Sequence, residues 1–304
     1  MVGRGGVAER SNAVVLKTTG RQPRPGGSNP SPSAHAGRRR SAGERPAYSR
    51  SVDDLADHRD DWEALGEIDP LYAILSAPAA KHGEWDVTAF LATGEADAAR
   101  ILGACEALGL PAARHASFEL GCGVGRITRA LAPGFGRSVG VDISGPMIAR
   151  ARAMNADRPT CEWVVNDSPD LAAFPDGAFD LVLSFIVLQH VPDRAVISSY
   201  LREMARILAP GGALVVQMPA SMPLRQRIQW RRRAYRALRA ARVPERTLYQ
   251  RLGLDPIRMN WLPRRDVEAA LRLGGARVVS VQDGWLGDGS RTGREQNLTY
   301  IATR

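Results

Sequence analysis

Residues 117–128 read Ser-Phe-Glu-Leu-Gly-Cys-Gly-Val-Gly-Arg-Ile-Thr, and this stretch decides the fold. A short apolar segment ends at Glu119, and Gly121, Gly123 and Gly125 then follow at alternate positions before a helix-compatible stretch. Glycine is needed in such a turn because the backbone must turn tightly and let a ligand approach without a Cβ in the way. The stretch therefore predicts a strand, a ligand-binding loop and a helix whose first N–H groups are unpaired.

A second strand is predicted to end at Asp142, within the run Val-Gly-Val-Asp-Ile-Ser of residues 139–144. A carboxylate at this place can accept hydrogen bonds from both hydroxyls of a ribose. A dinucleotide fingerprint has the spacing Gly-x-Gly-x-x-Gly, whereas here an acid is followed by three glycines at alternate positions. A glycine-rich loop alone is also compatible with a loop that binds nothing, but the acid after the next strand favours a nucleotide-type cofactor.

The pattern closely resembles motif I of the class I S-adenosylmethionine-dependent methyltransferases, with Asp142 in the place of the ribose-binding acid. Residues 166–168 resemble the acidic segment that receives the adenine amino group, and Pro-Gly-Gly at 210–212 resembles a signature of small-molecule members. The resemblance covers residues 62–304 and implies S-adenosyl-L-methionine as the cofactor. The cofactor-binding residues that we predict are Glu119, Gly121, Gly123, Gly125, Arg126, Asp142, Ile143, Met147, Asn166, Asp167, Ser168 and Ser184.

The remaining elements follow the same fold. Residues 179–184 form an apolar run without alternation, as expected of a parallel strand that is buried on both faces. An amphipathic helix ends at the Pro-Gly-Gly, and a further buried strand follows at 213–216. With a helix at 263–273 and last strands at 277–282 and 297–303, we predict an α/β fold with a doubly wound, seven-stranded, mostly parallel sheet of the Rossmann-like type.

We divide the chain into a disordered basic tail (1–50), an N-terminal helical lid (51–110) and a methyltransferase domain (111–304). In the lid, a helical apolar pattern is interrupted at Asp69-Pro70, where proline is expected to start a second helix, and another helix follows from residue 87. Such an extension lies over the cofactor cleft in related methyltransferases. Its aromatic residues would line the cleft or simply pack between helices; they are Trp62, Tyr72, Trp85 and Phe90.

The tail carries most of the net charge. Residues 1–50 contain ten Lys and Arg against two acids, so they supply +8 of the +9, while the rest of the chain balances 31 bases against 30 acids. Its Gly-, Pro-, Ser- and Arg-rich composition predicts disorder. Residues 7–20 and 27–30 resemble the translation of a bacterial serine tRNA gene, which suggests that translation begins near Val52. The alternative is a genuine basic arm that binds nucleic acid or anionic lipid.

The three cysteines, Cys105, Cys122 and Cys161, have no metal-ligand spacing, so we predict no metal site and a reducing compartment. No apolar run approaches the roughly 20 residues of a membrane span. We also found no secretory h-region and cleavage site at the start of the chain. These observations together predict a cytoplasmic protein.

An insertion at 221–260 contains eleven arginines against Glu245 and Asp255. Four apolar residues fall near one helical face, which predicts a basic amphipathic helix; they are Leu224, Ile228, Tyr235 and Leu238. In small-molecule members such insertions cover the substrate, and a cationic cover favours an acidic or carrier-bound acceptor. The alternatives are a solvated helix face, a helix on an anionic membrane surface, and a site for RNA phosphates.

His190 is the candidate catalytic residue. It follows the predicted strand at 179–184, at the carboxyl edge of the sheet, where open α/β sheets bind their ligands. A histidine there can remove a proton near neutral pH. The alternative to this catalytic role is helix capping or cofactor positioning. The Asn/Asp-Pro-Pro-Tyr motif of nucleic-acid amine methyltransferases is missing after Ser184.

We therefore predict methyl transfer to a small molecule, at oxygen in preference to nitrogen or carbon, with nucleic acid disfavoured as the acceptor. Two alternatives remain open at this point. One is an RNA methyltransferase that uses the arginine-rich insertion, and the other is a non-catalytic protein that binds the cofactor.

Overall fold

The computed structural model describes residues 47–76, 85–286 and 296–304. They belong to one compact unit, residues 45–304. The predicted tail lies outside the described residues up to position 46, and so does the suggested tRNA-derived segment. Residues 47–50, which we assigned to the tail, form the first turn of helix α1 (Ala47–Ile68).

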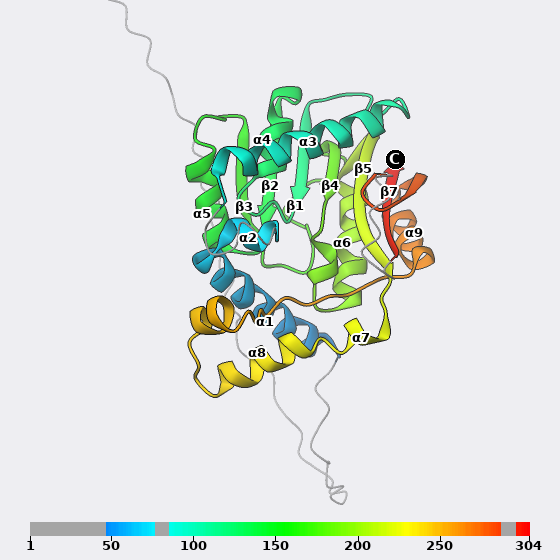
Figure 1. Cartoon of the computed structure of the whole chain (residues 1–304). Helices are drawn as coiled ribbons and strands as arrows, with labels where there is room; N and C mark the ends of the chain where they lie inside the picture. Colours follow the sequence, from blue (N-terminus) through cyan, green and yellow to red (C-terminus); the bar gives the residue numbers. More distant parts are fainter. Residues whose placement is uncertain (1–46, 77–84, 287–295) are drawn as a thin grey trace, which may run out of the picture. The chain divides into compact units, whose positions relative to one another are not determined.

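The described strands form one seven-stranded sheet of order β3-β2-β1-β4-β5-β7-β6 (Figure 1). All neighbours pair in parallel except β7, which is antiparallel to both β5 and β6. The predicted seven-stranded, mostly parallel sheet is therefore confirmed. The strands are β1 (Ala116–Leu120), β2 (Arg137–Asp142), β3 (Cys161–Val165), β4 (Phe179–Ser184), β5 (Leu208–Ser221), β6 (Arg277–Asp283) and β7 (Gln296–Thr303).

The strand order reverses between β1 and β4, because β2 and β3 lie on one side of this pair and β5 to β7 on the other. Ligands of open α/β sheets bind at such a switch point, outside the carboxyl ends of the strands. The glycine run directly follows β1, and His190 lies shortly after β4. The topology thus brings both predicted parts of the site to one edge of the sheet.

Helices cover both faces of the sheet. On β4, Leu181 and Leu183 pack in a core with α3 (Val87–Glu106) and α4 (Arg126–Leu131), whereas Val182 packs in a core with α6 (Arg194–Ile207) and α9 (Arg264–Leu273). Successive side chains of a strand point to opposite faces, so this strand is buried from both sides. The prediction from its apolar run is confirmed, and β1 is likewise buried along its whole length.

The helical N-terminal segment lies at the carboxyl ends of the strands. Helix α2 (Pro70–Ile74) begins at the proline where the sequence predicted a second helix. Helix α1 lies below the sheet in Figure 1, between the strand ends and the helices of the insertion. Its backbone is joined to the chain after β2, because the Ser144 hydroxyl donates a hydrogen bond to the carbonyl of Trp62 at 3.3 Å. Among the described helices, none is long and apolar enough to cross a membrane.

Strand β5 differs from the expectation. It begins at Leu208, directly after α6, and includes the Pro-Gly-Gly that we expected to separate helix and strand. Phe179 pairs with Leu208 and Leu181 pairs with Ala213, so β5 carries extra residues between these two pairs. The Pro-Gly-Gly fills this irregularity, since residues without a regular ladder partner tolerate proline and glycine.

Part of the insertion forms a basic amphipathic helix as predicted, but the four apolar residues that indicated it do not share one helix. A left-handed Gln229, with φ of 47°, separates α7 (Leu224–Arg227) from α8 (Trp230–Ala240). Because the break changes the helix direction, Leu224 and Ile228 are exposed while Tyr235 is buried against Leu248 and its neighbours.

Candidate active site

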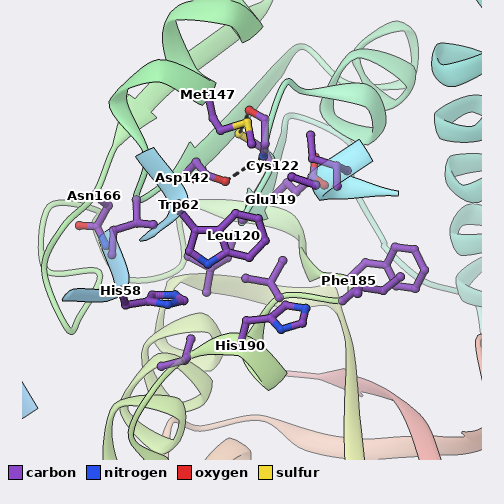
Figure 2. Close-up of a pocket in the computed structure, with 18 of the residues that line it drawn as sticks. His58, Trp62, Glu119, Leu120, Cys122, Asp142, Met147, Asn166, Phe185 and His190 are labelled. Atoms are coloured by element: carbon purple, nitrogen blue, oxygen red, sulfur yellow. Dashed lines mark hydrogen bonds between the residues drawn. The ribbon is translucent and has the colours of Figure 1, made fainter. Parts of the chain in front are cut away.

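A pocket lies at the carboxyl ends of β1, β2 and β4 and is covered by α1 and α2 (Figure 2). Nine of the thirteen predicted site residues line it: Glu119, Gly121, Gly123, Arg126, Asp142, Ile143, Met147, Asn166 and His190. Gly125, Asp167, Ser168 and Ser184 lie outside the lining.

The glycine loop fits a ligand that approaches its backbone closely. Gly121 and Gly123 have left-handed φ angles of 76° and 55°, which favour glycine. A Cβ on Gly121 would lie 2.3 Å from a methyl of Val187, and a Cβ on Gly123 would lie 2.5 Å from the terminal methyl of Ile74. Any side chain here would fill the cradle between the loop and its cover. Gly125 instead packs against the Trp163 ring, so it shapes the loop from behind.

Asp142 joins the glycine loop to the chain that follows β2. One carboxylate oxygen accepts the N–H of Gly123 and the other accepts the N–H of Ser144, both at 2.9 Å. Burial raises the pKa of Asp142, while these backbone donors oppose the shift. Each oxygen has a second lone pair, so the carboxylate can accept two further hydrogen bonds from a diol.

Glu119 lies beneath the same loop. Its carboxylate accepts a hydrogen bond from the Thr128 hydroxyl, and its burial raises its pKa to about 7 despite that bond and the nearby charge of Arg126. The Arg126 guanidinium is engaged elsewhere, since it pairs with Asp97 at 2.5 Å and lies over the Phe185 ring. The pocket therefore receives little positive charge from Arg126.

Asn166, and not Asp167, is the residue after β3 that lines the pocket. Its amide nitrogen donates to the carbonyls of Ser168 and Asp170, which leaves its amide oxygen as an acceptor. Asp167 is 66% exposed and forms an ion pair with Arg59 at 3.6 Å. The residue that the resemblance assigned to the adenine amino group thus faces outward.

Two predicted serines have structural partners. The Ser184 hydroxyl is buried and donates to the carbonyl of Leu120 at 3.1 Å, which joins the ends of β4 and β1. The Ser168 hydroxyl donates to Asp170, and its carbonyl accepts the hydroxyl of Tyr200. Both serines stabilise the loops around the pocket without lining it.

The chain turns sharply after β4. Ile186 has a φ of 57°, which a β-branched residue rarely adopts. Its N–H is held by the side-chain oxygen of Gln217 at 3.2 Å. This turn directs Val187 against Gly121 and starts the single helical turn η3 (Leu188–His190) that carries His190. Backbone strain of this kind persists where the surroundings fix it, and it clusters at functional sites.

His190 has a defined tautomer. Its Nδ1 lies 2.7 Å from the carbonyl of Arg258, so Nδ1 carries the proton and donates it. Its Nε2 lies 3.3 Å from the Gln189 amide nitrogen and accepts from it. Burial lowers the pKa of His190. The ring is therefore neutral at physiological pH, with a proton-accepting nitrogen in the pocket.

Helix α1 contributes Leu55, His58 and Trp62 to the pocket. The sequence interpretation considered Trp62 but missed His58 and Leu55. The available signal was their spacing, since residues at i, i+3 and i+7 share one helix face. Of the other aromatic residues that we considered for the lid, Tyr72 packs against Tyr249, and Trp85 packs against Phe90. These contacts match the packing alternative.

The neighbouring face of α1 carries three aspartates that bind arginines of the insertion. Asp54 pairs with Arg258 at 3.0 Å, Asp57 with Arg236, and Asp61 with Arg239 at 3.3 Å. We call these three pairs the α1 ion-pair ladder; it places α1 beside α8 in Figure 1. Burial raises the pKa of Asp61 to about 6, although the charges of Arg232, Arg236 and Arg239 oppose this shift.

The ladder changes the interpretation of the insertion. None of the described side chains that line the pocket comes from residues 221–260. Three of the eleven arginines that we expected to face an acidic acceptor, Arg236, Arg239 and Arg258, instead bind the helix that covers the pocket. The structure therefore gives no support to a cationic substrate cover.

The ladder yields a stability prediction. Arg239→Gln is expected to lower the free energy of unfolding by about 1 kcal/mol, because it leaves the buried Asp61 without its partner. Urea denaturation at pH 7 measures this change. Arg265→Gln is the matched control, since that guanidinium side chain is 87% exposed and pairs only with its neighbour Asp266 among the described residues. Equal stability of the two variants would show that the ladder does not stabilise α1.

Residues 118–216 match the family model described as a methyltransferase domain. The 2-methyl-6-phytyl-1,4-hydroquinone methyltransferase of Synechocystis is 39% identical over 99 residues, which are 32% of this chain and 30% of that protein. Trans-aconitate 2-methyltransferase of Azoarcus is 39% identical over 104 residues, 33% and 38% of the two chains. Demethylmenaquinone methyltransferase of Tropheryma whipplei is 36% identical over 115 residues, 37% and 45%. The match thus spans less than half the length of each of these relatives.

Solved structures show the same fold. Magnesium protoporphyrin IX methyltransferase from Synechocystis, with bound S-adenosylhomocysteine, has a TM-score of 0.52 at 19% identity and covers 83% of this chain and 100% of that chain. An S-adenosylmethionine-dependent methyltransferase from Clostridium acetobutylicum has a TM-score of 0.51 at 16% identity and covers 76% and 98%. At these identities the similarity concerns the fold alone.

Proposed function

We propose, from the class I S-adenosylmethionine-dependent methyltransferase domain that residues 118–216 form, that this protein transfers a methyl group to an oxygen of a small molecule. The observation that carries the proposal is the neutral His190, whose Nε2 faces the same pocket as the glycine loop and Asp142. A proton acceptor beside a cofactor cradle is what methylation of a hydroxyl requires.

The pocket residues fit S-adenosyl-L-methionine. The two carboxylate oxygens of Asp142 suit the ribose hydroxyls, and the amide oxygen of Asn166 suits the adenine amino group. Gly121 and Gly123 leave room for the rest of the molecule against the backbone. When bound, the cofactor supplies an electrophilic methyl group on a positively charged sulfur.

His190 is the residue to which we assign the proton. Methyl transfer is an in-line displacement, so the protein mainly aligns the reactants, and a base is needed where the acceptor loses a proton. The carbonyl of Arg258 fixes the proton on Nδ1, so Nε2 is directed to accept. The same carbonyl stabilises the imidazolium that forms when Nε2 takes the acceptor's proton.

The lining favours an uncharged acceptor. The two histidines share the pocket with the apolar lining residues Leu55, Trp62, Ile186 and Val191. The positive charge of Arg126 is balanced by its ion pair with Asp97. The names of the relatives include a phytyl hydroquinone, demethylmenaquinone and trans-aconitate. Of these, the ring compounds suit an apolar site better than the carboxylate-rich aconitate does, because burying unpaired charge is unfavourable.

Radiolabelled S-adenosylmethionine tests the proposal. We expect label to be transferred to uncharged phenols from a panel that also contains carboxylic acids and total tRNA. Transfer to tRNA would favour the RNA methyltransferase alternative, which the α1 ion-pair ladder disfavours by occupying several arginines of the insertion. Cofactor binding without transfer to any acceptor would favour the non-catalytic alternative.

A further inference from the structure

His58 is a buried histidine of the pocket that the proposed function does not use. Only 8% of the residue is exposed, and it lines the pocket. Neither ring nitrogen forms a hydrogen bond with any residue of the described ranges, whereas Nδ1 of His190 is held by the Arg258 carbonyl and its Nε2 has only a 3.3 Å contact with Gln189. The ring nitrogens of His58 are not among the described polar atoms that are sealed from solvent without a partner, so they are open to the pocket. Their position therefore points to a ligand that completes their hydrogen bonds.

The rings of His58, Trp62 and His190 lie together on one side of the pocket (Figure 2). The Trp62 ring centroid is 6.2 Å from that of His58 and 5.8 Å from that of His190, with interplanar angles of 82° and 58°. The indole thus contacts both imidazoles. In Figure 2 Asp142 and Met147 lie on the opposite side, where the glycine loop and α5 (Gly145–Met154) meet.

Both histidines present neutral polar edges. Burial lowers the pKa of His58 to about 3, and the positive charges of Arg258 and Arg232 add to this effect. A neutral imidazole carries one donor and one acceptor nitrogen. The three rings therefore offer hydrogen bonds at two places and an aromatic surface between them, with no cation among them.

We propose that His58, Trp62 and His190 form an acceptor subsite for a flat ring that carries two oxygen substituents. His190 receives the hydroxyl that is methylated, His58 hydrogen-bonds the second oxygen, and Trp62 lies against the ring. This inference rests on the proposed function and adds His58 as a specificity-determining residue. It also names the acceptor class, a dihydroxylated aromatic compound.

The energetic reason is that a ring with one oxygen would leave His58 unpaired. A site built to hydrogen-bond a substrate hydroxyl can reject the analogue without it by as much as about 10⁴-fold. A weaker preference applies here because a water molecule can replace the missing oxygen. We therefore expect dihydroxybenzenes to exceed phenol by about 10-fold or more in kcat/KM.

The experiment compares four probes, hydroquinone, catechol, resorcinol and phenol, with the parent protein, His58→Leu and His58→Asn. In the parent, at least one dihydroxybenzene should be preferred over phenol. His58→Leu should abolish the preference through a raised KM with kcat largely kept, and His58→Asn should retain part of it. Affinity for S-adenosylhomocysteine, measured by calorimetry, should stay within about twofold. His115→Asn, an exposed histidine outside the pocket, is the matched control.

Four results overturn the inference: an unchanged preference in His58→Leu, a lost affinity for S-adenosylhomocysteine, equal use of all four probes, or methylation of none. The first three leave the proposed function standing, whereas the fourth contradicts both. If His58→Leu does not fold, ¹⁵N NMR of the parent loaded with S-adenosylhomocysteine replaces it. The His58 ring resonances should then shift on addition of a dihydroxybenzene and stay unchanged with phenol. Equal shifts with both probes, or none, also contradict the inference.

Discussion

Asp142→Ala is expected to weaken the binding of S-adenosylmethionine by about 100-fold. The parent carboxylate can offer two charge-assisted hydrogen bonds to the ribose, each worth about 1.5–3 kcal/mol, and every 1.4 kcal/mol is about tenfold in affinity. The substitution also removes the acceptors of the Gly123 and Ser144 N–H groups, so the loop loses its tie to α5. Calorimetric titration with the cofactor measures the loss.

Asp167→Ala is the matched control for this prediction. The resemblance assigned that acid to the adenine, but the structure places it outside the pocket lining and 66% exposed. Its replacement should leave the affinity within about twofold. Parental affinity in Asp142→Ala would mean that the cofactor does not lie against the end of β2. A thermal melt of each variant separates a local loss of binding from global unfolding.

His190→Ala is expected to reduce kcat by about 10²- to 10⁴-fold, the range that a positioned general base contributes. Affinity for S-adenosylmethionine should be unchanged, because we assign the cofactor to the glycine loop and Asp142, which do not depend on His190. Gln189→Ala serves as the control, since it removes only the long hydrogen bond to Nε2. If His190→Ala keeps the parental kcat, His190 is not the base, and the alternative role in helix capping or cofactor positioning applies.

The pH dependence of kcat offers a separate check on His190. Only the neutral ring accepts a proton, so kcat should fall as the pH drops below its pKa. Because burial lowers that pKa below the ordinary histidine value of 6.5, kcat should stay level from pH 8 to 6.5 and decline only at lower pH. A decline centred at 6.5 or above would show that the ring is more solvated than the structure indicates.

The half of the pocket that we assign to the cofactor could be located from the sequence because its residues lie close together in the chain. Gly121 and Gly123 are recognisable from the turn that they make, and Asp142 from its place at the end of the next strand. Local sequence did not separate Asn166 from Asp167, because which of two adjacent side chains faces the pocket depends on the loop that follows β3. That loop is fixed by distant contacts, among them the Tyr200 hydroxyl on the carbonyl of Ser168.

The acceptor half could not be predicted, because its partners are far apart in the sequence. Asp54 and Arg258 are 204 positions apart, and Asp57 and Arg236 are 179 apart. The arginine count alone did not show whether these charges face a ligand, solvent or another helix. Only the packing of the insertion on α1 decides that they bind aspartates, which turns Leu55, His58 and Trp62 toward the pocket.

The sequence by itself thus determined the sheet, the cradle after β1 and the acid after β2, since continuous apolar runs, glycine geometry and strand ends are local properties. The tertiary structure decided which helix covers the glycine loop and whether the side chains that it presents to the pocket are charged. Ion pairing and burial depend on which surfaces meet in space. For that reason only the folded structure shows that His58 is neutral and that one face of α1 lines the pocket.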